Sequence, residues 1–147
     1  MRALIVRAHP LQAPQSRSMA LADAFVDAFR TSHRDARIKE LRLYEVAVPE
    51  IDLDMLTGWQ LIREGEHFAH LSPAQQNKLT LFDAYTQQLL DADLVVVANP
   101  LWNLSVPNRL KAWIDAVVVA GKTFRYTSSG EAEGLAKGTT VVHLQTS

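Results

Sequence analysis

The chain has 147 residues, of which 48% are hydrophobic and 21% charged, the composition of one folded domain rather than of a disordered segment. Fifteen basic against sixteen acidic residues leave a formal net charge of -1, which argues against nucleic-acid binding through bulk positive charge and against a polybasic membrane surface. The chain has no cysteine, so disulfide frameworks, thiolate metal sites and cysteine nucleophiles are excluded.

The sequence predicts neither a membrane-spanning segment nor a signal peptide. No apolar run approaches the ~18 residues that cross a bilayer, and the apolar stretch within residues 1–7 is too short for a signal peptide. We therefore expect a cytoplasmic protein without a membrane partner.

The first half of the chain predicts a strand, a helix and a second strand. A continuous apolar run predicts a buried strand over 2–7, and a loop with two prolines follows it. Ser16 or Ser18 is expected to cap a helix over 18–33. One apolar stripe of that helix is expected to comprise Leu21, Ala24, Phe25, Ala28 and Phe29. A weaker strand is predicted over 36–43, and a short helix near 53–63 in an irregular segment.

The second half continues the alternation. Ser72, Pro73 and Gln75 have the spacing of a capping box and predict a helix that runs to Leu90. A run of five apolar residues predicts a central strand over 93–98. A helix over 106–119 ended by Gly121, a strand pair or irregular excursion over 122–137 and a last strand over 139–145 complete the pattern.

This order of elements predicts an α/β protein with a doubly wound parallel sheet. The flavodoxin-like strand order would be 2-1-3-4, with a fifth strand missing from this chain. In such sheets ligands bind beyond the carboxyl ends of the strands, at the topological switch point between the first and third strands. The converging loops are then 8–17 and 99–105, with the segment beginning at Thr146 and Ser147 as their neighbour.

The two loops differ in chemistry. The first has neither the GxGxxG fingerprint nor a GxxxxGKS/T phosphate loop, which disfavours a Rossmann nicotinamide site and a nucleotide triphosphatase. Ser16, Arg17 and Ser18 at a helix N-terminus suit a phosphate monoester, although plain helix capping explains the serines equally simply. The second loop offers Trp102 and Asn103 to a flat heteroaromatic ring, or Trp102 to the core.

Two segments carry a family resemblance. Residues 100–115 read PLWNLSVPNRLKAWID, and residues 121–126 read GKTFRY. In this order they resemble the flavodoxin-fold NAD(P)H:quinone oxidoreductase and FMN-dependent NADH-azoreductase family. Residues 2–10 are similar to the quinone-reductase branch, and the serine pair to the azoreductase branch.

The resemblance implies a flavin bound without a covalent link. FMN fits the azoreductase-like loop better than FAD, although His9 followed by Pro10 departs from that branch and leaves FAD open. The implied phosphate contacts are Ser16, Arg17 and Ser18, with His9 nearby. The implied contacts of the isoalloxazine ring are Leu101, Trp102, Asn103 and Leu104; Pro100 is a further implied cofactor contact, and Ser147 begins a third contact loop.

The activity implied by the resemblance is transfer of two electrons from NAD(P)H to a quinone or azo compound by a ping-pong mechanism. The cofactor supplies the hydride chemistry, so no side chain is assigned a catalytic role. A homodimer is implied as well, with no nucleic-acid partner. His67 and His70 lack a third ligand nearby, so no metal site is predicted.

Three alternatives stay open beside this enzyme. A flavin-binding electron carrier would usually be strongly acidic, which a net charge of -1 does not match. A regulatory subunit would keep the fold without activity. A phosphoacceptor receiver would need acidic residues after the first strand, where this chain has Ala8, His9 and Pro10.

The family pattern continues past the last predicted strand. By that pattern, residues 1–147 form a single flavodoxin-like domain that is C-terminally incomplete, and the fourth strand would be an unpaired sheet edge. A truncated product of a longer enzyme is therefore expected.

Overall fold

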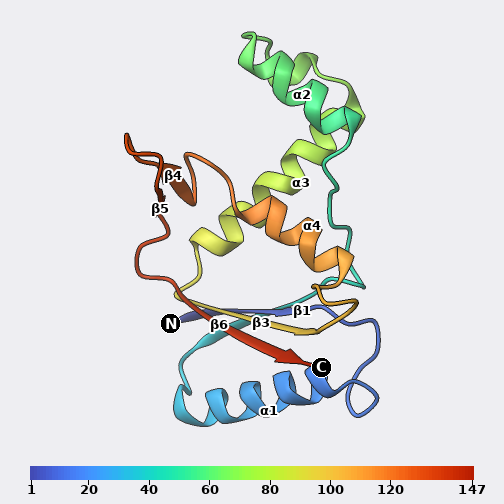
Figure 1. Cartoon of the computed structure of the whole chain (residues 1–147), viewed down its shortest axis with the longest axis vertical. Helices are drawn as coiled ribbons and strands as arrows, with labels where there is room; N and C mark the ends of the chain where they lie inside the picture. The colour runs from blue at the N-terminus through green and yellow to red at the C-terminus, as the bar shows by residue number, and fades with distance from the viewer.

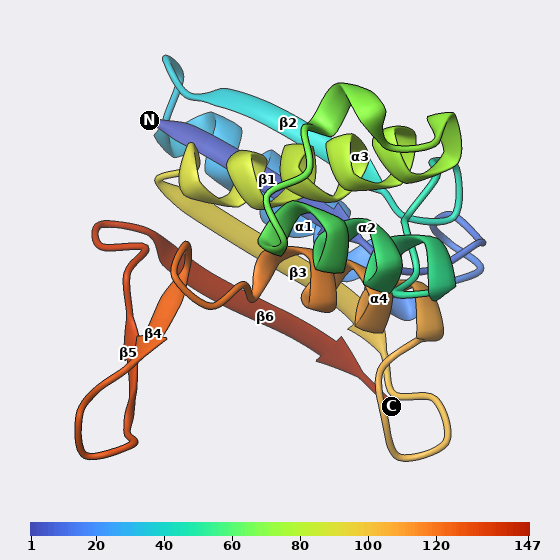
Figure 2. The ribbon, with the colours of Figure 1, turned by 90° about the horizontal axis from the view of Figure 1, so that it is seen from above.

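Four apolar segments form one parallel sheet in the computed structural model, which describes all residues from Met1 to Ser147. The strands are β1 (Arg2–Arg7), β2 (Arg37–Arg42), β3 (Leu94–Pro100) and β6 (Thr140–Thr146), in the spatial order β2-β1-β3-β6 (Figure 2). All three pairings are parallel. The predicted flavodoxin-like order 2-1-3-4 is confirmed, with β6 as the fourth strand of the sheet.

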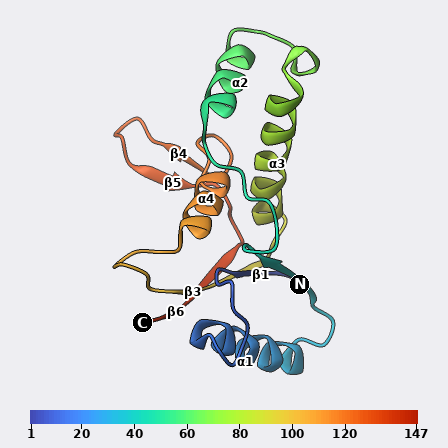
Figure 3. The same cartoon turned by 90° about the vertical axis from the view of Figure 1, so that its right-hand side faces the viewer.

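The helices lie on both faces of this sheet. Helix α1 (Arg17–Ser32) covers one face, and α3 (Pro73–Leu90) and α4 (Asn108–Val117) cover the other (Figures 1 and 3). Helix α2 (Leu53–Arg63) packs on α3, followed by a short 3-10 helix, η1 (Phe68–His70). None of these helices combines the length and the apolar composition that crossing a bilayer requires.

A small antiparallel hairpin projects beside the main sheet. Its strands are β4 (Phe124–Tyr126) and β5 (Ala132–Gly134), as Figure 2 shows. The predicted excursion over 122–137 is therefore a strand pair.

The core consists of two apolar layers, one on each side of the central strands. Leu4 and Val95 face α3 and α4, where they pack with Tyr85 and Trp113. On the opposite face, alternate residues of the same strands pack against α1. Burial on both faces explains why β1 and β3 read as continuous apolar runs rather than as alternating ones.

The predicted face of α1 is only partly right: Phe29 is buried and Phe25 packs against the core, but the other three residues do not. Leu21 is 40% exposed, and Ala24 and Ala28 are exposed as well. The residues that the helix buries are Ser18, Met19, Ala22, Val26 and Phe29. Both stripes are apolar and have helical spacing, so periodicity alone does not choose between them, whereas packing against the sheet does.

The predicted ends of α4 also need correction. The helix begins at Asn108 rather than near 106, because Pro107 occupies the N-cap position with an extended backbone. It ends at Val117, with Val118 as its C-cap, so Gly121 does not terminate it. Gly121 instead has a φ of 83° in the turn before β4, a conformation that glycine adopts without strain.

Helix caps were predicted more accurately. Ser16, not Ser18, is the N-cap of α1, and its Oγ accepts a hydrogen bond from the N–H of Met19. Ser72 and Gln75 form the complete capping box at the start of α3. The short helix over 53–63 is confirmed, with Asp52 as its N-cap.

Candidate functional site

Three loops meet at the carboxyl edge of the sheet, where the switch point was predicted. The first follows β1, the second follows β2, and the third joins β3 to α4; the C-terminus lies beside the third (Figure 2). Backbone hydrogen bonds fix their starting points, because the N–H of Ala8 donates to Ala98 and the N–H of Leu43 donates to Arg7. The N–H of Leu101 donates to the carbonyl of Thr146 at 2.7 Å, which places Ser147 beside the third loop.

Each loop contributes an aromatic ring to one cluster. The ring centroids of His9 and Trp102 are 5.4 Å apart, and those of Tyr44 and Trp102 are 6.3 Å apart, both edge to face. Trp102 remains 40% exposed. The reading of Trp102 as a core residue is therefore wrong, and its ring lies where a ligand can contact it.

Tyr44 and Arg109 belong to this site and were missed by the sequence reasoning. The guanidinium of Arg109 lies 5.4 Å from the Tyr44 ring centroid. It also donates to the carbonyls of Leu43 and Val46, both at 2.9 Å. Tyr44 lies two residues after the end of β2, so the rule that parallel strands end at one edge could have found it. Arg109 carries no such signal, since its partners lie more than 60 residues away.

Burial shifts two tyrosine hydroxyls of this region. Desolvation raises the pKa of Tyr44 above its usual value, and the charge of Arg109 opposes that shift. Desolvation also raises the pKa of Tyr85, again against the charge of Arg109; the Tyr85 hydroxyl donates to the carbonyl of Ala47 at 2.6 Å. Both phenols therefore remain protonated at neutral pH and can act as hydrogen-bond donors.

The start of α1 has the donors that a phosphate requires. The backbone N–H groups of Arg17 and Ser18 donate to no group of the chain, while the Ser16 side chain and carbonyl bind Met19 and Ala20. The Ser16 and Ser18 hydroxyls are 3.0 Å apart and both residues are buried. Arg17 is exposed at the same end of the helix. Free N–H groups, two hydroxyls and a guanidinium at a helix N-terminus fit a phosphate monoester.

A buried arginine holds this helix against the sheet. Arg7, at the end of β1, is 3% exposed and donates to Asp23 of α1 at 2.7 Å and to Glu40 of β2 at 2.8 Å. Its guanidinium also donates to the carbonyl of Met19 at 3.4 Å. The position of the α1 N-terminus relative to the strands therefore depends on this charge network.

The third loop contains a tight turn under backbone strain. Trp102 and Ser105 exchange two backbone hydrogen bonds, both of 2.9 Å. The two residues between them have positive φ angles, 50° at Asn103 and 61° at Leu104, which is the conformation of a type I′ turn. Leu104 is 91% exposed. A bulky residue in this conformation is uncommon and is a feature of ligand-binding loops.

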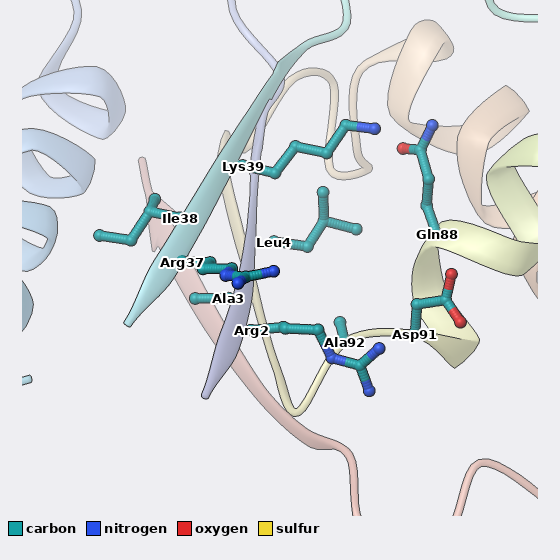
Figure 4. A pocket seen from close by; sticks show the side chains of 9 residues that line it. All are labelled: Arg2, Ala3, Leu4, Arg37, Ile38, Lys39, Gln88, Asp91 and Ala92. Carbon is teal, nitrogen blue, oxygen red and sulfur yellow. The ribbon is translucent and has the colours of Figure 1, made fainter. Parts of the chain in front are cut away.

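Other hollows lie away from these loops. A cavity of about 250 Å³ opens at the amino end of β1 and β2, beneath the last turn of α3 (Figure 4). Its walls carry Arg2, Arg37 and Lys39, with Gln88 and Asp91 opposite. Ligands of doubly wound sheets bind at the carboxyl ends of the strands, so this cavity is not the candidate site.

The histidine pair and the acidic turn have structural partners. His70 bonds Glu66 at 2.8 Å on the surface, which lowers the pKa of the Glu66 carboxyl. Lys78 of α3 bonds Asp52 and Asp54 at the start of α2. The Lys78 contacts thus tie the start of α2 to α3, whereas the His70–Glu66 pair is local to the connection between the two helices.

The carboxyl-edge site brings the predicted residues together. Ser16, Arg17 and Ser18 lie at the start of α1, and His9 faces Trp102 across the first and third loops. Pro100 ends β3, and Leu101, Trp102, Asn103 and Leu104 form the third loop.

Comparison with known proteins gives a consistent result. Residues 1–147 match the family described as flavodoxin-like fold. An FMN-dependent NADH:quinone oxidoreductase of Geobacillus kaustophilus is 40% identical over 144 residues, which are 98% of this chain and 68% of that protein. One of Staphylococcus carnosus is 39% identical over 142 residues, 97% of this chain and 66% of that protein. The chain thus spans about two thirds of the length of the curated relatives it matches, and continuation of the natural protein stays a prediction.

Solved structures agree with this assignment. An azoreductase from Bacillus anthracis strain Sterne superposes with a TM-score of 0.86 at 33% identity, covering 98% of this chain and 67% of that one. An FMN-dependent NADH-azoreductase from Bacillus anthracis strain Ames Ancestor, solved in complex with FMN, gives a TM-score of 0.89 at 28% identity, over 98% and 68% of the two chains. The resemblance found in the sequence is confirmed, and the chain belongs to the flavodoxin-like fold family of FMN-dependent NADH:quinone oxidoreductases and azoreductases.

Proposed function

We propose that this chain is the flavin-binding part of an FMN-dependent oxidoreductase that passes two electrons from NADH to quinones or azo compounds. The observation that carries the proposal is the convergence of an α1 N-terminus with free N–H groups and an exposed aromatic loop at one sheet edge. The relatives are named for FMN, NADH and quinones, and the structural neighbours for azo compounds.

The residues present fit FMN. Ser16, Arg17 and Ser18 would hold its phosphate, because their N–H groups, hydroxyls and guanidinium all favour an anion. His9 would lie near the phosphate, residues 101–104 would line the ring, and Pro100 and Ser147 would add further contacts to the cofactor. Bound there, FMN would supply the hydride chemistry, so the chain binds and orients. FMN rather than FAD is proposed because the names of the relatives specify it.

Backbone groups are expected to do most of the orienting at the ring. The type I′ turn holds its N–H and C=O groups in one arrangement through the two bonds between Trp102 and Ser105. Arg109 fixes the neighbouring loop by donating to the carbonyls of Leu43 and Val46. The backbone groups of these two loops are therefore ordered before a ligand binds, so less conformational entropy is lost on binding.

The order of events is proposed to be ping-pong. NADH would give up a hydride and leave as NAD⁺ before the quinone or azo compound occupies the same place beside the third loop, and bound FMN would store the two electrons between these events. Initial rates at several fixed quinone concentrations should give parallel double-reciprocal lines against NADH. Intersecting lines would contradict this order. NADPH is to be compared with NADH in the same assay.

The enzyme assay also separates the proposal from its alternatives. The natural protein is purified, its visible spectrum is recorded, and the released chromophore is identified by mass. We expect FMN and steady-state oxidation of NADH with a quinone acceptor. A protein that binds FMN without turnover is an electron carrier or a regulatory subunit, and a protein that binds no flavin refutes the assignment.

Two further points belong to the same proposal. A homodimer is proposed, and support comes from exposed apolar side chains at the start of α2, with Leu53 75% and Leu56 54% exposed. Equilibrium sedimentation of the natural protein tests it, and a monomer at micromolar concentration would contradict it.

We also propose a cytoplasmic location, where NADH is available, with small molecules rather than nucleic acid or membrane as partners.

A further inference from the structure

The side chain of Asn99, at the end of β3, is buried with 0% exposed and bonded at both ends of its amide. Its Nδ2 donates to the carbonyl of Pro100 at 2.8 Å, and its Oδ1 pairs with Nε2 of His143 on β6 at 2.6 Å. A carbonyl only accepts hydrogen bonds, so the amide orientation is fixed. His143 must therefore carry a proton on Nε2 and donate it. The three groups form a directed chain, called here the His143–Asn99 relay.

The relay acts on the first peptide of the third loop. The carbonyl of the Pro100–Leu101 peptide accepts from Asn99, and the N–H of the same peptide donates to the carbonyl of Thr146 at 2.7 Å. Both sides of this peptide plane are thus held by bonds that depend on β6. The type I′ turn begins at the next residue, Trp102, so a rotation of this peptide would displace the turn.

We propose that His143 and Asn99 are positioning residues that aim the third loop at the cofactor. The inference rests on the proposed function, because its consequence is measured through FMN. Neither residue belongs to the predicted flavin contacts, and both act through the Pro100–Leu101 peptide.

His143 is exposed on the edge strand β6, where it lines an otherwise apolar hollow of about 340 Å³ with Val97, Val106 and Ile114. His143 is the one polar side chain of that lining, and it is bonded to a buried amide rather than to solvent alone. An N–H donor at this position serves the relay.

The test uses two variants of the natural protein. His143→Gln keeps an N–H donor, and His143→Leu keeps apolar bulk without a donor; Val141→Leu, on the same face of the same strand, is the control. We expect His143→Leu to bind FMN about tenfold more weakly, the effect of losing one well-placed hydrogen bond. Hydrogen exchange at residues 101–105 of the apoprotein should accelerate in the same variant. His143→Gln should restore most of both properties, and Val141→Leu should match the wild type.

The outcomes separate the inference from the proposed function. Wild-type protein that binds no FMN overturns both. Wild-type protein that binds FMN, with His143→Leu equal to it in affinity and loop exchange, overturns the relay and leaves the function standing. Equal losses in His143→Leu and His143→Gln, accompanied by the same loss of unfolding free energy in both, show a structural role only and also overturn it.

Discussion

Leu104 offers a direct test of strain in the third loop. Its φ of 61° lies in the left-handed region, and its side chain is 91% exposed. A left-handed conformation costs a bulky L-residue about 1–2 kcal/mol, and the exposed side chain has little packing to lose. Leu104→Gly removes that strain and creates Asn-Gly, the preferred pair of a type I′ turn. Glycine also lowers stability by about 0.5–1 kcal/mol through chain entropy, so a net gain of ~0.5–1 kcal/mol is expected.

A matched control isolates the strain. Leu11 is 51% exposed in the first loop and does not have a positive φ, so Leu11→Gly should lose about 0.5–1 kcal/mol. Urea unfolding of the apoproteins measures both changes. FMN affinity should fall in Leu104→Gly while stability rises, since the proposed ring contact is removed. If Leu104→Gly destabilises the protein as much as Leu11→Gly does, the turn stores no strain and the reasoning is refuted.

Three further variants test the supports of the site. Arg7→Met should destabilise the protein by ~1–2 kcal/mol in urea, because two partly exposed carboxylates lose their buried partner; an unchanged midpoint would contradict the network. Ser16→Ala should lower both FMN affinity and, by about 1 kcal/mol, stability; equal affinity would exclude Ser16 from the phosphate site. The hydrogen bond from Lys78 holds the pKa of Asp52 below its usual value, so Lys78→Met should raise that pKa in an NMR titration. The stability difference from wild type should be present at neutral pH and shrink as the pH falls through the Asp52 pKa of the folded protein, although Lys78 also bonds Asp54; a difference that does not shrink would contradict it.

The elements that the sequence predicted well are those specified by residues close together in the chain. The run of apolar residues in β3 and the capping box at Ser72 are specified by residues next to one another, and both elements appear within two residues of their predicted bounds. The carboxyl-edge rule then predicted where the candidate site lies, because it depends only on the strand order, which the structure confirms.

The features that sequence reasoning missed depend on tertiary contacts. Arg109 reads as a surface residue, yet its guanidinium bonds two carbonyls of a loop far away in the chain. Asn103 tolerates a positive φ, but residues 102–105 contain no glycine to follow it, so the sequence does not signal two successive positive φ angles. The buried face of α1 depends on which of two apolar stripes packs against the sheet. These choices follow from packing rather than from local propensity.

The position of FMN on the natural protein tests the central claim most directly. A crystal structure of the complex should show the phosphate bonded to the N–H groups of Arg17 and Ser18, with the ring against residues 101–104. A phosphate bound elsewhere, or a ring away from Trp102, would contradict the account.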